Sequence, residues 1–310
     1  MHTSPGEDRR TDSTSSIAPI SLLPTDLLLR IFLQCLLDRK TPATPVILSH
    51  VCRSWRSVAL DSPLLWTNIE AVVPQFSDRQ HILLRMMLNP GQKRETDEEH
   101  RARWMRVMGS LIVVTKEWIA RSRGAPLSVK FRITRLKQPP EWMKEKIAEL
   151  VEALLESSAR WEEVDFEIDL PSFEQYNFLF SRILDDAPHH LPILRKIHLA
   201  VWLDDPRPLT PHTGPALFNA PSLRSLHLSP PWPTFLFNAT PIMTVPWSQL
   251  TTLNLGASLK MPSNFHLSAG LHNLDARALL KLLRVCTNLS SLTYSRSATG
   301  SDTEAGMENS

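Results

Sequence analysis

The sequence predicts a two-part protein, in which a short helical module is followed by a larger α/β region with a parallel sheet. Two observations support this prediction. Apolar residues recur at helical spacing between positions 24 and 60, and a loose Leu-x-x-Leu-x-Leu figure recurs later in the chain. Its five copies begin at residues 161, 194, 223, 250 and 289. A length of 310 residues allows two such units.

The composition argues against several classes of protein. Lys and Arg total 34 against 32 acidic residues, which gives a net charge of +2. So small a charge argues against binding to nucleic acid or to a membrane surface. The N-terminus has no apolar run typical of a secretion signal, and we expect a cytoplasmic or nuclear protein. Three scattered cysteines, Cys35, Cys52 and Cys286, form no C-x-x-C pair and are interpreted as core thiols in a reducing compartment.

Both ends of the chain are polar. Residues 1–19 and 296–310 contain too little apolar surface to offset the entropy of ordering them, so we expect both to be disordered. The two folded units are therefore predicted between these segments, with a boundary near residue 70.

The N-terminal module is predicted to have two helices and a short turn. The first helix covers residues 24–37, with Pro24 at its start, and the second runs from the Thr44-Pro45 cap through position 60. A third turn begins at Ser62-Pro63 and presents Leu65 and Trp66. A module of this size cannot bury its own apolar surface. The apolar stripes of its helices therefore either dock on the rest of the chain or contact a partner.

The segments "LLPTDLLLRIFLQCL" and "VILSHVCRSWRSVALDSPLLW" closely resemble an F-box over residues 20–70. The matching positions are Leu23, Pro24, Leu27, Leu28, Ile31, Phe32, Val51, Cys52, Trp55, Leu65 and Trp66. Asp26 stands where the family more often has Glu, a small departure because either carboxylate favours the first turn of a helix. The insert "DRKTPATP" is typical of fungal members.

The resemblance implies a function. The matching residues would bind a Skp-type adaptor, and the chain would be the substrate-receptor subunit of a Skp/cullin/F-box ubiquitin ligase in the ubiquitin conjugation pathway. The open alternative is a scaffold whose F-box acts outside any ligase, or whose box caps the rest of the chain.

Residues 71–295 are expected to alternate helices with strands. Helical periodicity covers 104–124 and 140–158, and 172–185 and 273–286 are two further predicted helices. Strands are predicted near 127–133, 163–168, 195–203, 224–228, 251–255 and 290–294, neighbours in one parallel sheet with right-handed connections. The region resembles the divergent leucine-rich-repeat solenoid of many fungal F-box proteins, although its spacing is irregular and it lacks an Asn or Cys ladder.

Strand alternation predicts which residues face away from the core. In each copy the apolar positions point inward, so Asp165, Glu167, His198, Trp202 and His227 lie on the opposite, concave face. We expect this face to bind a protein substrate of unknown identity. Trp202 has two interpretations: an exposed anchor, or a ring covered by the proline-rich loops 204–219 or 230–246.

Enzymatic motifs are missing from the sequence. No phosphate loop, zinc-protease motif or nucleophile elbow occurs, and we expect no catalytic residue, metal or cofactor. Catalysis would then belong to partner enzymes.

Overall fold

A computed structural model describes residues 23–39, 43–76, 96–134, 139–170, 191–203, 216–229, 245–256 and 276–294. The chain divides into two compact units, residues 1–65 and 66–310. The segments predicted to be disordered, 1–19 and 296–310, lie outside the described residues, as does the predicted helix 172–185.

The N-terminal unit is helical. Helices α1 (Thr25–Arg39), α2 (Thr44–Ser49) and α3 (Arg53–Asp61) are followed by a short 3-10 helix, η2 (Pro63–Trp66), which reaches the start of the second unit. The sequence predicted a single helix from 45 to 60, and this prediction was wrong. The helix is broken because Cys52 takes an extended backbone and becomes the N-cap of α3, where its Sγ accepts a hydrogen bond from the Trp55 amide.

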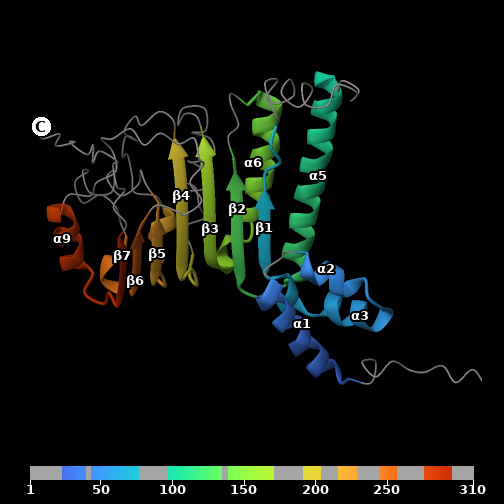
Figure 1. Ribbon diagram of the computed structural model, residues 1–310, viewed down its shortest axis with the longest axis horizontal. Helices are drawn as coiled ribbons and strands as arrows, with labels where there is room; N and C mark the ends of the chain where they lie inside the picture. Colours follow the sequence, from blue (N-terminus) through green and yellow to red (C-terminus); the bar gives the residue numbers. More distant parts are fainter. Residues whose placement is uncertain are drawn as a thin grey trace, which may run out of the picture. The chain divides into compact units, whose positions relative to one another are not determined.

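The second unit is built on a parallel seven-stranded sheet, with its strands in sequence order (Figure 1). The strands are β1 (Asn68–Val72), β2 (Leu127–Ile133), β3 (Trp161–Leu170), β4 (Lys196–Leu203), β5 (Ser225–Leu228), β6 (Thr252–Leu255) and β7 (Ser291–Tyr294). The predicted parallel arrangement of six strands is confirmed for β2 to β7. Strand β1 was not predicted; it adds to the edge beside β2.

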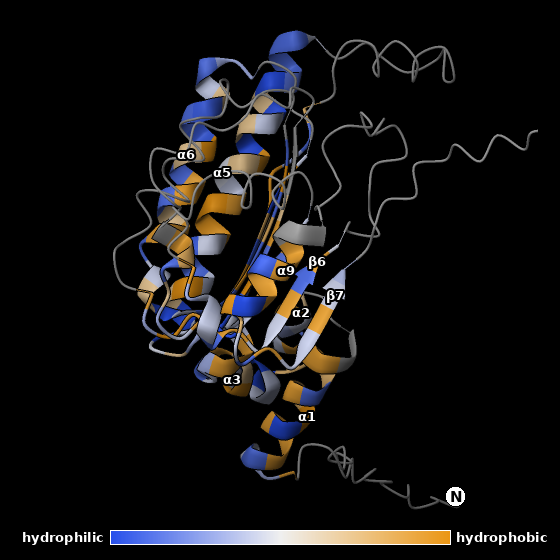
Figure 2. Cartoon of the chain, turned by 90° about the vertical axis from the view of Figure 1, so that its left-hand side faces the viewer, coloured by the Kyte–Doolittle hydropathy of each residue, from blue (hydrophilic) through white to orange (hydrophobic). Residues whose placement is uncertain are grey.

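Helices α5 (Asp97–Arg121), α6 (Glu141–Leu155) and α9 (Ala276–Val285) lie on one face of this sheet (Figure 2). Helix α5 begins earlier than the predicted position 104 because Thr96 and Glu99 form a capping box, each side chain accepting from the other's backbone amide. Shorter 3-10 helices are η3 (Ser158–Arg160), η6 (Ala216–Phe218) and η7 (Trp247–Gln249).

The core lies between the sheet and these helices. One row of apolar side chains crosses all seven strands in register: Ile69, Val129, Val164, Ile197, Leu226, Leu253 and Leu292. Helix residues such as Trp104, Met108 and Ile147 belong to the same core. Apolar and polar residues alternate along β6 and β7 (Figure 2), so the polar side chains are left on the other face.

Within the described part of the chain, no helix has both the length and the apolar character needed to cross a membrane.

Candidate interaction surfaces

The N-terminal unit exposes an unusual amount of apolar surface. Val51 is 57% exposed, Ile47 50% and Leu27 46%. Other exposed apolar side chains of this unit are Ile31, Leu37, Val46, Leu60 and Leu64. Soluble proteins rarely leave so many large apolar side chains in water on so small a unit, and such surfaces mark interaction sites.

The residues that match the F-box pattern fall into two groups. Leu27, Ile31, Val51, Pro24 and Cys52 are exposed, and Leu23 and Trp55 are half-buried. Leu28, Phe32, Leu65 and Trp66 are buried within the chain. Burial of this second group gives it a packing role in the free protein, whereas the first group presents the apolar surface.

Two buried aromatic residues that match the F-box pattern pack against other rings of the chain. Phe32 packs against Trp55 with ring centroids 4.9 Å apart, which joins α1 to α3. Trp66 packs in the second unit, edge-on to Trp118 at 5.1 Å, and the Arg121 guanidinium lies 4.6 Å from its ring centroid. The pattern alone could not separate these packed rings from the exposed positions.

Sequence reasoning missed part of this surface. Ile47, Val46 and Leu64 match no position of the F-box pattern, yet all are exposed, while the neighbouring Leu48 is buried. Val46 and Ile47 lie on α2 with Leu48, and Leu64 lies on η2 beside the buried Leu65, so apolar spacing alone gave no signal that separates exposed from buried members. The interpretation of all three cysteines as core thiols also fails: Cys52 is exposed, although Cys286 is buried.

The second surface is the face of the sheet opposite the helices, which we call the polar face. Its central row crosses the sheet in register and consists of Glu70, Lys130, Asp165, His198, His227, Asn254 and Thr293. The sequence predicted that Asp165, Glu167, His198 and His227 share one face, and the register confirms it. Whether this face binds a substrate stays a prediction.

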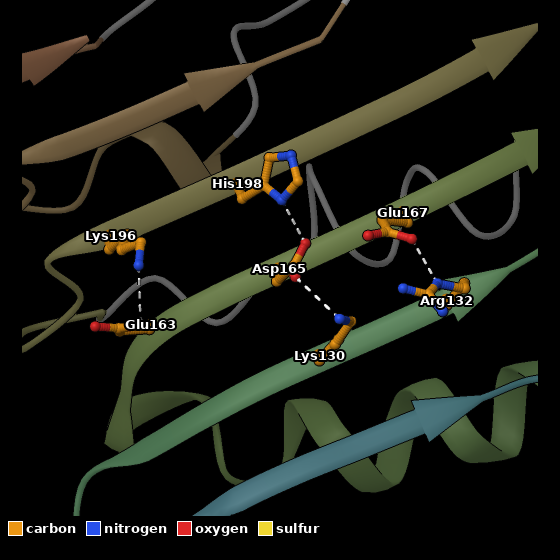
Figure 3. A network of polar contacts seen from close by, with 7 residues as sticks. All are labelled: Lys130, Arg132, Glu163, Asp165, Glu167, Lys196 and His198. Atoms are coloured by element: carbon orange, nitrogen blue, oxygen red, sulfur yellow. Dashed lines mark hydrogen bonds and ion pairs between the residues drawn. The ribbon is translucent and has the colours of Figure 1, made fainter. Parts of the chain in front are cut away.

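Asp165 is the centre of a small polar network (Figure 3). His198 Nδ1 donates a hydrogen bond to Asp165 Oδ1 at 2.6 Å, and Lys130 Nζ lies 3.6 Å from Oδ2. Burial alone would raise the pKa of Asp165, but the hydrogen bond from His198 and the nearby positive charges lower it below its usual value. Asp165 is therefore ionised near neutral pH and can only accept hydrogen bonds.

His227 stacks on His198, with ring centroids 4.1 Å apart and an angle of 21° between the planes. Burial, and then the proximity of His198, lowers the pKa of His227 to about 4, against the opposing effects of Asp165 and of a hydrogen bond with the Gly256 backbone. His227 is therefore neutral near pH 7.

Ion pairs flank this network. Arg132 Nε donates to Glu167 Oε2 at 2.5 Å, and Lys196 Nζ lies 3.3 Å from Glu163 Oε2 (Figure 3). Arg132–Glu167 and Lys130–Asp165 place opposite charges on neighbouring positions of β2 and β3, and Lys196–Glu163 does the same for β4 and β3. The hydrogen bond with Glu167 raises the pKa of Arg132, more than burial lowers it.

Trp202 lies in β4, opposite Asp169 of β3. Its side chain is outside the described residues, as are most of the loops 204–219 and 230–246, so the two interpretations of Trp202 both stay open.

Among the described residues, no group of three or more His, Cys, Asp or Glu side chains is arranged to hold a metal ion. Burial raises the pKa of the Cys286 thiol, which lowers its reactivity as a nucleophile.

The comparisons with known proteins give one match. The F-box-like family model matches residues 20–70, so the chain carries an F-box-like domain at these positions. No curated protein and no solved structure matches the chain. The domain match covers the segment that contains the exposed apolar surface of the N-terminal unit.

Proposed function

We propose that this protein is a non-catalytic substrate-receptor subunit of a Skp/cullin/F-box ubiquitin ligase. At a general level, an F-box-like domain suggests a ubiquitin-ligase substrate adaptor. The observation that carries the proposal is the agreement between this domain and the exposed apolar side chains. Leu27, Ile31 and Val51 lie in the matched segment and are exposed to solvent.

The adaptor-binding surface consists of these exposed residues together with Ile47 and the half-buried Trp55. Among the buried matching residues, Phe32 packs against Trp55 and supports the exposed ones, and Leu28 and Leu65 are buried as well, whereas Trp66 packs in the second unit. A helical apolar surface of this kind binds into a groove of its partner, and a few large side chains supply most of the free energy.

The second unit would hold the substrate. Its parallel sheet, with strands in sequence order and apolar rows on one side, supports the interpretation as a divergent leucine-rich-repeat solenoid. The polar face, with Asp165, Glu167, His198, Trp202 and His227, would bind a protein substrate. Binding there would bring a substrate lysine close to the ubiquitin-charged enzyme and raise its effective concentration.

The protein would act in the cytoplasm or nucleus, where the ligase core operates. The fungal origin of the domain rests on the insert between α1 and α2.

The test is co-purification of the full chain with a Skp-type adaptor and a cullin, compared with a chain lacking residues 20–65, which keeps Trp66 and β1 of the second unit. We expect the adaptor and cullin to be lost from the truncated chain while other partners are retained. A full chain that binds the adaptor but never recruits a cullin would instead favour the scaffold alternative.

A further inference from the structure

Helix α5 presents a row of apolar side chains to solvent. Val113 is 67% exposed, Val114 49% and Val107 48%, whereas Trp104 and Met108 on the other side of the helix are buried in the core. Residues three or four apart share one side of a helix, so the valines belong to one continuous surface. We call it the α5 face, and its members are Arg106, Val107, Gly109, Ser110, Val113 and Val114. Because α5 covers the helix side of the sheet, this surface is separate from the polar face (Figure 2).

The polar groups on this side of α5 already have partners. Ser110 Oγ donates a hydrogen bond to the Arg106 carbonyl at 3.0 Å. One turn beyond Val113, Glu117 accepts a hydrogen bond from Arg121 Nε at 2.7 Å. Covering the α5 face would therefore remove three valine side chains from water without leaving either of these groups unpaired.

Gly109 lies in the middle of α5, where a glycine makes the helix less stable than an alanine would. A Cβ added there would meet nothing within 4 Å outside the helix's own backbone, so the packing of the chain does not require a glycine. A glycine on a helix surface also allows the backbone of another element to approach closely. This position therefore indicates close contact with a partner.

The charges along this part of α5 are mostly positive. Between residues 102 and 121 the helix carries four cations and one carboxylate, Glu117, which is paired with Arg121. Arg106 and Lys116 are exposed and make no ion pair with another described residue. They are ten positions apart, which is about 15 Å along the helix axis. The valines thus lie between two unpaired positive charges.

We propose that the α5 face binds an acidic amphipathic helix of a partner protein. The apolar side chains of that helix would pack between the valines and over Gly109, as the ridges of one helix pack into the grooves of another. Its carboxylates, at matching spacing, would pair with Arg106 and Lys116. This interaction is independent of the adaptor and substrate surfaces of the proposed function.

Charge and side-chain size argue against other occupants of the α5 face. The chain's own segment 77–95 has an apolar run but carries four cations and two carboxylates, so it would bring like charge. The exposed ridge of α6 on a second copy is acidic, but among the described residues it has no large exposed apolar side chain to cover the valines. Helices that bind membranes insert Trp, Phe or Leu, whereas the apolar residues exposed here are valines.

The test uses the full chain and three fluorescent helical peptides. The first has leucine and alanine on one side and glutamate on both flanks. One control has lysine in place of each glutamate, and the other has glutamine in place of each leucine. We expect the glutamate peptide to bind with a dissociation constant on the order of 10 μM, and each control at least about tenfold more weakly, as measured by fluorescence anisotropy. Added salt should weaken the glutamate peptide.

Gly109→Ala is the most discriminating substitution. It should raise the midpoint of thermal unfolding, because alanine favours the helix, and yet weaken the glutamate peptide about fivefold, because the new Cβ holds the partner away. Gly124 has the same open space but lies beyond the end of α5, so Gly124→Ala should leave the affinity unchanged. Arg106→Glu should weaken the glutamate peptide about tenfold, whereas its control, Lys281→Glu on α9, should not.

The proposal is overturned if the lysine peptide binds as well as the glutamate peptide, if no peptide binds, or if Gly109→Ala binds as tightly as the wild type. Three further results would assign the face to another occupant and also contradict the proposal. These are much tighter peptide binding when residues 82–88 become a Gly-Ser linker, a dimer in sedimentation that Val114→Asp dissociates, and binding to phosphatidylserine vesicles that Arg106→Glu abolishes.

Adaptor binding is measured on the same variants. Gly109→Ala and Arg106→Glu should both retain the adaptor fully, so a failure of this proposal is separate from a failure of the proposed function.

Discussion

Phe32 of α1 and Trp55 of α3 contact each other ring to ring, with centroids 4.9 Å apart and planes inclined at 59°. Phe32 is fully buried, whereas Trp55 is half-buried and leaves part of its indole in solvent. The same tryptophan therefore serves the packing of the N-terminal unit on one side and the proposed adaptor surface on the other.

Replacing Trp55 with alanine should reduce both stability and adaptor binding. Loss of the ring leaves Phe32 without its aromatic contact, and we expect the free energy of unfolding of the N-terminal unit to fall by about 2 kcal/mol. Chemical denaturation measures this change, and calorimetry measures adaptor binding. Trp55→Phe should retain most of the stability; equal stability of Trp55→Ala and wild type would show that the contact is unimportant.

Val51→Asp should abolish most adaptor binding without unfolding the protein. Val51 is largely exposed, so a charge there costs little in the free chain but is buried without a partner in the complex. We expect about a 30-fold weaker affinity, the equivalent of about 2 kcal/mol. The matched control is Val113→Asp on α5, where the valine is 67% exposed and lies outside the matched domain. Similar losses for the two variants would argue against an adaptor surface at Val51.

Two ion pairs on the polar face should differ in their contribution to stability. Arg132 and Glu167 are mostly buried, with side chains 24% and 11% exposed, whereas Lys196 and Glu163 are about half exposed. Glu167→Gln should therefore lower the free energy of unfolding by about 1–2 kcal/mol, since it leaves a partly buried guanidinium unpaired. Glu163→Gln should change it by less than about 0.5 kcal/mol. Urea denaturation of both variants decides between this ranking and its reverse.

The stability of the second unit should fall as the pH drops from about 6.5 toward 4. His227 has a folded-state pKa of about 4 against 6.5 when exposed, so in this window the unfolded chain binds a proton that the folded chain does not. Its charged or titratable neighbours are His198, Asp165 and Lys196. The lowered pKa of Asp165 acts below this window, where its stabilising effect is lost as the pH falls below 3.8.

His227→Gln should flatten the pH dependence between 4 and 6.5, measured by denaturation at a series of pH values. His50→Gln, at an exposed position of the N-terminal unit, is the control and should retain the wild-type slope. An unchanged slope in His227→Gln would assign the effect to another group.

The sequence predicted the strands better than it predicted the helix boundaries. Alternation has a period of two residues, so it identified strands β2 to β7 and which of their residues share a face. It missed β1 because Asn68–Val72 is short and lies outside the repeated figure. It merged α2 with α3 because the apolar spacing continues through residues 50–52, where only the backbone of Cys52 shows the break.

The candidate sites were predictable to different degrees. The F-box pattern identified Val51 and Ile31, but it gave no way to separate them from Phe32 or Trp66, whose burial depends on contacts distant in sequence. The polar face could be assigned from alternation alone. The unpaired state of His198 Nε2 and Asn254 Oδ1 could not, because it depends on which atoms remain without a partner after the strands pair.

The sequential order of the strands has a consequence for how this unit folds. Each strand pairs only with strands next to it along the chain, so no segment waits for a distant one and assembly can spread outward from a first pair. The long, buried strands β2 and β3 are the natural starting pair. Strand β7 is the last to pair and the least buried. Its Leu292 is 39% exposed, although it continues a row whose other members are buried. The rate of amide hydrogen exchange should therefore increase from β3 toward β7. The gain or loss of one strand at the β7 edge would leave the pairing of all the other strands intact.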